Sequence, residues 1–159
     1  MKKLPVTWPE YHRKIEQLAL QIYESDWQFE QILCLARGGL RVGDILSRIF
    51  DRPLAVLCVS SYDHSGNRGQ LKFSATVSMT SAYLAGRLLV VDDLVDSGET
   101  LVKTLAWLKN SQPAIPQLRT AVIWYKACSQ IAPDYYVEYL ADNPWIVQPF
   151  EVYENFKFE

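Results

Sequence analysis

The sequence predicts a single α/β domain, residues 1–159, built on a central, mostly parallel, twisted sheet that is flanked by helices. Candidate strands alternate with candidate helices along the chain, which is typical of a parallel sheet. The candidate strands are apolar throughout rather than on alternate residues, as expected of strands buried on both faces. A length of 159 residues allows one core and is short for two ordinary domains.

Composition excludes several other classes of protein. Apolar residues make up 49% of the chain and charged residues 21%, which excludes a disordered chain. A net charge of −2 gives no bulk positive field, so we expect no nucleic-acid partner. No apolar run approaches the ~18 residues of a membrane helix, and no apolar segment follows Lys2 and Lys3, so we expect neither a membrane span nor a signal peptide. The odd number of cysteines, Cys34, Cys58 and Cys128, each in an apolar stretch, predicts reduced core thiols in a cytoplasmic protein.

The first half of the chain predicts two helices and two strands. Thr7-Trp8-Pro9-Glu10 has the form of a capping box, and apolar residues then recur at helical spacing as far as Ile22. A buried strand is expected over residues 32–36, where the following Arg37-Gly38-Gly39 closes an apolar run. The remaining elements of this half are a helix over residues 42–49, a strand over 54–59 and a polar loop over 60–74.

The second half continues the alternation. Residues 87–91 form the most apolar short run and predict a strand, and residues 118–125 predict another. Between them, residues 98–110 predict a helix with Leu101, Leu105 and Leu108 on its buried face. Ligands of such sheets bind at the carboxyl ends of the strands, so the segment after residue 91 is the first place to look for a site.

That segment combines three carboxylates with a glycine-containing turn. Asp92 and Asp93 follow the strand directly, Asp96 comes three residues later, and Ser97-Gly98-Glu99-Thr100 opens the helix. Carboxylates suit hydroxyl groups or a hydrated Mg²⁺. Backbone N–H groups at a helix start, with hydroxyls beside them, suit a phosphate. The pattern therefore predicts a ligand with both a phosphate and a diol, such as a phosphorylated sugar.

The acidic segment has two other interpretations. It could simply cap the helix, although three acids and a Ser-Gly-x-Thr turn are more than capping needs. It could also be the Mg²⁺-binding acid pair of a response-regulator receiver. That pair follows the first strand, whereas here the pair lies past the middle of the chain.

Residues 92–100 resemble the diphosphoribosyl-binding motif of the type I phosphoribosyltransferases. Four further segments, residues 36–40, 60–64, Lys126 and 145–149, are similar in order and spacing to the bacterial xanthine–guanine enzymes of that family. The resemblance covers residues 6–151. It implies the type I fold with a small hood region. It also implies a Mg²⁺-dependent purine-salvage enzyme that moves phosphoribosyl from 5-phospho-α-D-ribose 1-diphosphate to N9 of a 6-oxopurine and releases pyrophosphate. The family also implies a homodimer or homotetramer.

The resemblance implies roles for the acidic segment residue by residue. Asp92 and Asp93 would contact the ribose hydroxyls and the metal shell, with Asp93 as the metal residue. Asp96 would be the general acid/base near N7 of the purine. Ser97, Gly98, Glu99 and Thr100 would wrap the 5′-phosphate.

It implies roles for the other segments too. Arg37 and Gly38 would bind pyrophosphate in a loop where the family often has a non-proline cis bond at the corresponding Arg37–Gly38 peptide. Arg68 and Lys72, in a mobile catalytic loop over residues 61–74, would also reach the pyrophosphate.

The base site is implied by residues late in the chain. Lys126 would hydrogen-bond the purine 6-oxo group, Trp145 would stack on the base, and Ile146 would lie beside it. The sequence does not rank guanine, xanthine and hypoxanthine as acceptors. A different acceptor base, or a regulatory binding protein of the same fold, also stays open. The sequence departs from its relatives at Arg41, Glu99 and Ala127, where they have an apolar residue, glycine and proline.

Overall fold

The structure is a computed structural model that describes the backbone of residues 1–62, 68–74 and 76–158, and their side chains except those of 61, 62, 68 and 69. The helices are α1 (Trp8–Glu24), α2 (Leu40–Phe50), α3 (Glu99–Ser111) and the 3₁₀ helix η1 (Pro149–Asn155). The strands are β1 (Lys3–Pro5), β2 (Gln31–Ala36), β3 (Leu54–Tyr62), β4 (Arg68–Phe73), β5 (Ser78–Met79), β6 (Arg87–Val91), β7 (Leu94–Val95), β8 (Gln117–Lys126), β9 (Tyr135–Leu140) and β10 (Trp145–Val147).

The centre of the molecule is a parallel sheet, as predicted. Strand β2 pairs in parallel with β3 and with β6, and β8 pairs in parallel with β6, β7 and β9. Strand β7 continues the line of β6 along β8, because Val91 pairs with Ala121 and Leu94 pairs with Trp124. The two residues between β6 and β7 are Asp92 and Asp93, so the acidic pair lies at a break in the sheet.

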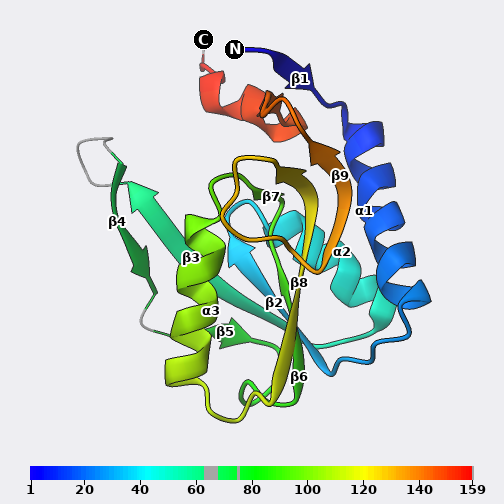
Figure 1. The fold of residues 1–159 in the computed structure, drawn as a ribbon, viewed down its shortest axis with the longest axis vertical. Coiled ribbons are helices and arrows are strands. Elements are labelled where there is room, and N and C mark those ends of the chain that lie inside the picture. The colour runs from blue at the N-terminus through cyan, green and yellow to red at the C-terminus, as the bar shows by residue number, and fades with distance from the viewer. Residues whose placement is uncertain (63–67, 75, 159) are drawn as a thin grey trace.

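Helices cover both faces of this sheet (Figure 1). Helices α1 and α2 pack on one face, where Ile32, Leu89 and Val91 contribute to the same buried cluster. Helix α3 packs on the other face with Leu33, Leu88 and Val90. Neighbouring residues of one strand therefore enter opposite cores, which explains why the strands are apolar throughout.

The predicted helices are confirmed with small shifts at their ends. Thr7 caps α1 through the capping box that the sequence predicts: its N–H donates to Glu10 Oε2 at 2.8 Å, and its hydroxyl accepts from Glu10 N. Leu101 and Leu108 of α3 are buried, and Leu105 packs against the same core.

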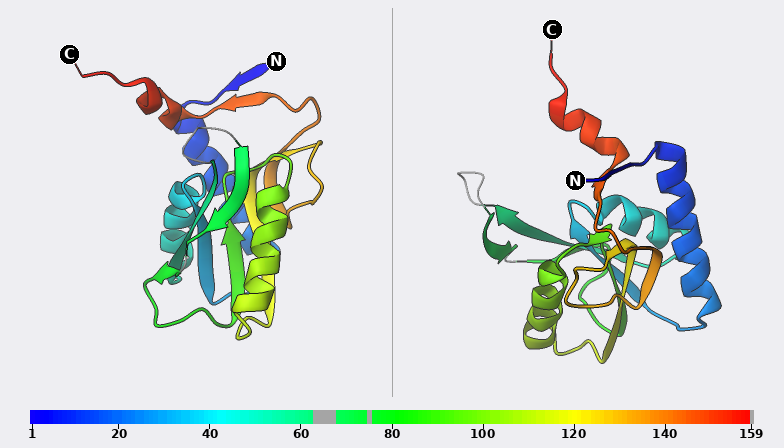
Figure 2. Two further views of the ribbon diagram at one scale, coloured as in Figure 1. Left: turned by 90° about the vertical axis from the view of Figure 1, so that its left-hand side faces the viewer. Right: turned by 45° about the horizontal axis from the view of Figure 1, so that its top comes forward.

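A small second sheet joins the two ends of the chain. Strand β1 pairs in parallel with β10, with Lys3 opposite Trp145 and Pro5 opposite Val147. Figure 2 shows β1, β10 and η1 together above the edge where the parallel strands end. This is the small hood region expected from the resemblance.

Two sequence predictions need correction, and β9 lies where none was made. Residues 60–74 are not simply a loop, because β3 runs to Tyr62 and β4 pairs antiparallel with it; residues 63–67 and 75 lie outside the described part. Besides this backbone pairing, Val59 of β3 and Phe73 of β4 pack against the core. Cys58 and Cys128 are exposed and only Cys34 is buried, although all three are free. Finally, β9 was not predicted, although its tyrosines and valine favour a strand. No helix in the described part of the chain is long and apolar enough to cross a membrane.

Candidate active site

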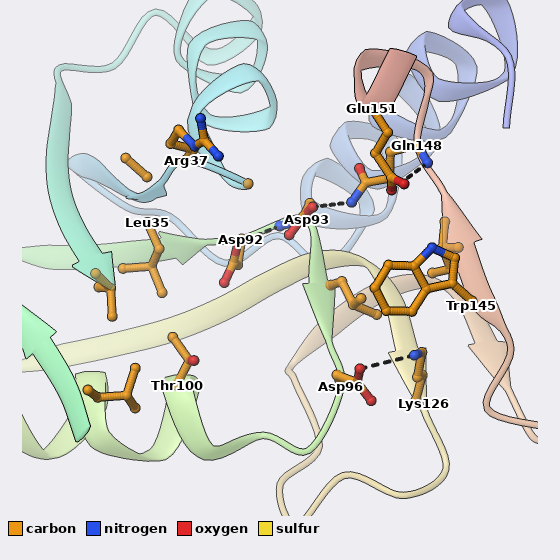
Figure 3. A pocket seen from close by; sticks show the side chains of 16 residues that line it. Leu35, Arg37, Asp92, Asp93, Asp96, Thr100, Lys126, Trp145, Gln148 and Glu151 are labelled. Carbon is orange, nitrogen blue, oxygen red and sulfur yellow. Dashed lines mark hydrogen bonds and ion pairs between the residues drawn. The ribbon is translucent and has the colours of Figure 1, made fainter. Parts of the chain in front are cut away.

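The carboxyl ends of three neighbouring strands, together with the hood, form one pocket of about 430 Å³ (Figure 3). The ends of β2, β6 and β8 supply Arg37, Asp92 and Lys126, and the hood supplies Trp145. The complete lining is Leu35, Ala36, Arg37, Gly38, Val59, Leu71, Asp92, Asp93, Leu94, Asp96, Thr100, Lys126, Trp145, Ile146, Gln148 and Glu151.

The loop after β2 brings backbone close to the acidic pair. A Cβ added at Gly38 would lie 2.5 Å from Asp93 Oδ1, and one at Gly39 would lie 2.6 Å from the carbonyl oxygen of Val91. Only glycine fits at such distances. The cis peptide bond of this loop is Ala36–Arg37, one bond earlier than the resemblance implied.

The two adjacent acids are held differently. Burial raises the pKa of the Asp92 carboxyl, and the negative charge of Asp93 raises it further. Asp92 Oδ1 accepts a hydrogen bond from the Asp93 backbone N–H at 2.9 Å. The Asp93 side chain accepts from the amide of Gln148, and its backbone oxygen accepts from Ile123 N and Trp124 N at 3.0 and 3.1 Å. The Asp93 carboxylate is therefore fixed between the sheet and the hood.

Asp96 and Lys126 form an ion pair inside the pocket. Lys126 Nζ donates to Asp96 Oδ2 at 3.0 Å, and the lysine side chain is only 6% exposed whereas that of Asp96 is 43% exposed. The Cys128 thiol donates to Asp96 Oδ1 at 3.5 Å. Both carboxylate oxygens thus have partners that orient them, while the carboxylate stays accessible. Trp145, which is 51% exposed, has its indole ring beside this pair (Figure 3).

The turn before α3 forms a smaller pocket of about 140 Å³, lined by residues 92–98, 100 and 101. Gly98 has a φ of 81°, and a Cβ there would lie 2.5 Å from Ser129 Oγ. The Glu99 side chain points along the helix to Lys103 Nζ at 2.6 Å, so its carboxylate pairs with a cation outside the pocket lining. Positive φ at Gly98 turns the chain so that the N-terminus of α3 opens toward the pocket, an arrangement suited to an anion.

The structure brings most of the predicted site residues together. Nine of them line the main pocket, and Ser97 and Gly98 line the small one. Lys72 lines a third pocket of about 650 Å³ that it shares with Arg37 and Gly38. The nine are Arg37, Gly38, Asp92, Asp93, Asp96, Thr100, Lys126, Trp145 and Ile146. The side chain of Arg68 lies outside the described residues.

Sequence reasoning missed Gln148 and Glu151. Gln148 is 8% exposed, donates through Nε2 to Asp93, and has a side-chain oxygen without a hydrogen-bond partner among the described residues. Glu151 Oε1 accepts from Gln148 N at 2.9 Å. The Q-x-x-E spacing was the available signal, since it is a variant of the capping-box pattern.

The donor set fits a magnesium ion that a substrate helps to bind. Within the described part of the chain there is no cluster of three or more potential ligand residues. The pocket does offer the Asp92 and Asp93 carboxylates. Mg²⁺ sites in proteins commonly use one or two carboxylates together with water and substrate phosphates.

Comparisons with known proteins agree with this architecture. The phosphoribosyl transferase domain family matches residues 6–155. A xanthine-guanine phosphoribosyltransferase from Idiomarina loihiensis is 31% identical over 152 residues, which cover 95% of this chain and 88% of that protein. The purine phosphoribosyltransferase of Pyrococcus horikoshii superposes with a TM-score of 0.75 at 30% identity, over 100% of this chain and 99% of that one.

A more distant structure has the same fold. The xanthine-guanine-hypoxanthine phosphoribosyltransferase of Helicobacter pylori gives a TM-score of 0.78 at 24% identity and covers 96% of both chains. Together with the family match over nearly the whole length, these findings identify the chain as a member of the phosphoribosyl transferase domain family.

Proposed function

We propose that this protein transfers the phosphoribosyl group of 5-phospho-α-D-ribose 1-diphosphate to N9 of a 6-oxopurine, with release of pyrophosphate. The observation that carries the proposal is that one pocket joins two kinds of surface. Asp92, Asp93 and Thr100 offer groups for a phosphorylated sugar, and Lys126 and Trp145 offer groups for a planar base. The xanthine-guanine and purine enzymes to which the chain is similar support the same substrates.

The sugar diphosphate would lie along the carboxyl ends of β2 and β6. The turn before α3 would take the 5′-phosphate on backbone N–H groups and hydroxyls. The loop at Arg37 and Gly38, with Lys72 beside it, would take the pyrophosphate. Asp92 and Asp93 would face the ribose hydroxyls, with Asp93 also facing the metal shell.

The base would enter between Trp145 and the Asp96–Lys126 pair. An ammonium group has three donor hydrogens, so Lys126 can bind a purine 6-oxo group while it stays bonded to Asp96. Trp145 would stack on the purine, and Ile146 would pack at its edge.

The transfer itself would depend on how these side chains surround C1′ and the base. As the C1′–O bond to pyrophosphate breaks, the carboxylates of the pocket would stabilise the positive charge of the sugar. Asp96 would accept the N7 proton of the purine while N9 bonds to C1′. Mg²⁺, held by Asp93 through its shell, would supply Lewis-acid stabilisation of the departing pyrophosphate.

The proposal includes a cytoplasmic homodimer or homotetramer. The free cysteines support a reducing compartment. Val152, Tyr153, Phe156 and Phe158 are exposed on and just after η1, and such an apolar surface favours association. Light scattering at micromolar concentration should give a mass above that of one chain; a monomer mass would contradict this part of the proposal.

The function is tested by a pyrophosphate-release assay with the sugar diphosphate, Mg²⁺ and each base in turn. We expect release with guanine, xanthine or hypoxanthine and far slower release with adenine. Absence of release with every purine would overturn the proposal, and equal release with adenine would show that Lys126 does not contact the base.

A further inference from the structure

We propose that Gln148 is a positioning residue that holds the Asp93 carboxylate from the hood, directly after the strand that carries the base-binding residues. This inference rests on the proposed function, because it assigns Asp93 to the sugar diphosphate and its metal. It is carried by the hydrogen bonds and burial of Gln148.

Gln148 lies between the two parts of the hood. It follows β10, which carries Trp145 and Ile146, and it is the N-cap residue of η1. Its side chain is buried and its Nε2 donates to Asp93 Oδ2, while its backbone N–H donates to Glu151 Oε1 at 2.9 Å. Figure 3 shows the chain of contacts from Asp93 through Gln148 to Glu151. The polar contact between the hood and the acidic pair therefore passes through this amide.

The hood on its other side is anchored by aromatic packing. Phe150 lies edge-on to Tyr11, with ring centroids 6.0 Å apart, and the Arg41 guanidinium lies 4.2 Å from its ring centroid. Phe150 thus fixes the chain two residues beyond Gln148. The amide is held at a set distance from the sheet, because β10 fixes it on one side and Phe150 on the other.

Apart from the contact with Gln148, other neighbours also restrict the movement of Asp93. Its backbone oxygen is bonded to β8, and Gly38 approaches its carboxylate so closely that a Cβ would meet Oδ1 at 2.5 Å. The remaining freedom is rotation of the carboxylate about its side-chain bonds. A carboxylate accepts hydrogen bonds only, so a fixed N–H donor selects one orientation. Since small displacements of a positioning group cost large factors in binding and rate, removing this donor should weaken binding of the sugar diphosphate.

The discriminating experiment separates the two substrates. Gln148→Met keeps the length of the side chain and removes the donor, and Gln148→Asn keeps the amide but shortens its reach. We expect either variant to raise the KM for the sugar diphosphate about 10-fold and to change the KM for guanine less than 2-fold. Gln21→Met, on the exposed face of α1, is the matched control and should leave both constants unchanged. If Gln148 only supported the hood, the KM for guanine would rise at least as much, because Trp145 lies on β10, which Gln148 follows directly.

A second measurement does not depend on activity. In thermal unfolding without substrates, Gln148→Met should lower the melting temperature by about 3 °C in the otherwise unchanged protein. In an Asp93→Ala background, Gln148→Met should lower the melting temperature by less than half as much, because the hydrogen-bond partner of Gln148 is missing. Equal shifts in both backgrounds, or an unchanged KM for the sugar diphosphate, would overturn the positioning role. Absence of transferase activity in the unmutated protein would instead overturn the proposed function. The unfolding measurements with and without Asp93→Ala would still show whether Gln148 holds Asp93.

Discussion

The two sides of the pocket that we assign to the sugar and to the base are built in different ways. The sugar side is built mainly from one continuous segment, residues 92–100, which runs from the end of β6 into the first turn of α3 and is joined by the loop at Gly38. The base side combines Lys126 at the end of β8 with Trp145 and Ile146 of β10, and β10 is paired with β1 at the opposite end of the sequence. Lys3 and Trp145, at opposite ends of the sequence, therefore pair beside this part of the pocket.

The difference suggests how each side responds to change. The sugar side depends on backbone geometry, namely the close approach of Gly38 and the positive φ of Gly98. The base side depends on side chains, namely the buried ammonium of Lys126 and the indole ring of Trp145. We therefore expect damage to the sugar side to affect every acceptor base alike, and damage to the base side to change the preference between bases.

Removal of Mg²⁺ should have the largest effect and should not distinguish bases. The phosphate charges of the sugar diphosphate would face Asp92 and Asp93 without neutralisation, and like charges at close range repel. An excess of chelator should abolish pyrophosphate release with guanine and hypoxanthine alike, and added Mg²⁺ should restore it. Full activity in chelator would contradict the proposed metal.

Asp96→Asn tests the residue at the junction of the two sides. Turnover should fall by ~10²–10⁴-fold, the usual range for a positioned acid or base. Calorimetry should show little change in sugar diphosphate binding, because the phosphate turn and the acidic pair remain. Asp142→Asn, an exposed position paired with Lys2, is the control and should keep its turnover. Turnover near that of the unmutated protein in the Asp96 variant would exclude the acid/base role.

Lys126→Met should act on the base side alone. The 6-oxo group loses its charged donor, so kcat/KM for guanine should fall about 100-fold. The kcat/KM for adenine should change little, so the ratio of kcat/KM between guanine and adenine should fall. Lys109→Met, exposed on α3, is the matched control. An equal fall for both bases would show that Lys126 acts through Asp96 rather than through base recognition.

Gly98→Ala should give the smallest effect and tests the backbone dependence of the sugar side. A Cβ at φ 81° and 2.5 Å from Ser129 Oγ should lower the unfolding free energy by about 1–3 kcal/mol. Gly86→Ala is the control, because Gly86 also has positive φ but lies beside Glu30 and outside the described pocket linings. Both variants should melt at lower temperature, and only Gly98→Ala should weaken binding of the sugar diphosphate. Equal weakening in both would mean that general destabilisation, not the turn, is responsible.

The elements that could be predicted are those with local signals. The capping box at Thr7 fixes the start of α1, and the apolar run before Asp92 predicts β6 at the boundaries that the structure has. The acidic segment could be assigned to a sugar phosphate because its groups are adjacent in sequence and therefore adjacent in space. The same reasoning could not find the short strand β7 inside that segment, since two residues carry no periodicity.

Other features had no local signal or a misleading one. Strand β4 mixes charged and polar residues with Leu71 and Phe73, so its composition alone favoured a loop, whereas its backbone pairs with β3. Cys128 lies in an apolar stretch and yet is exposed, because the chain turns out of the sheet after Lys126 and places the thiol beside Asp96. No local sequence pattern indicated that Gln148 contacts Asp93, because the two residues are 55 positions apart in the sequence.

The sequence by itself determined the alternation of strands and helices, the acidic segment with its turn, and through its motifs the resemblance to the phosphoribosyltransferases. These are properties of neighbouring residues, and neighbouring residues carry the periodicity and turn chemistry on which such inference depends. Only the tertiary structure decided that Lys126 pairs with Asp96, that Gly38 lies against Asp93, and that Gln148 joins the hood to the acidic pair. Those contacts join residues far apart in the chain, and their geometry exists only once the sheet has aligned the ends of its strands and both termini have closed over them.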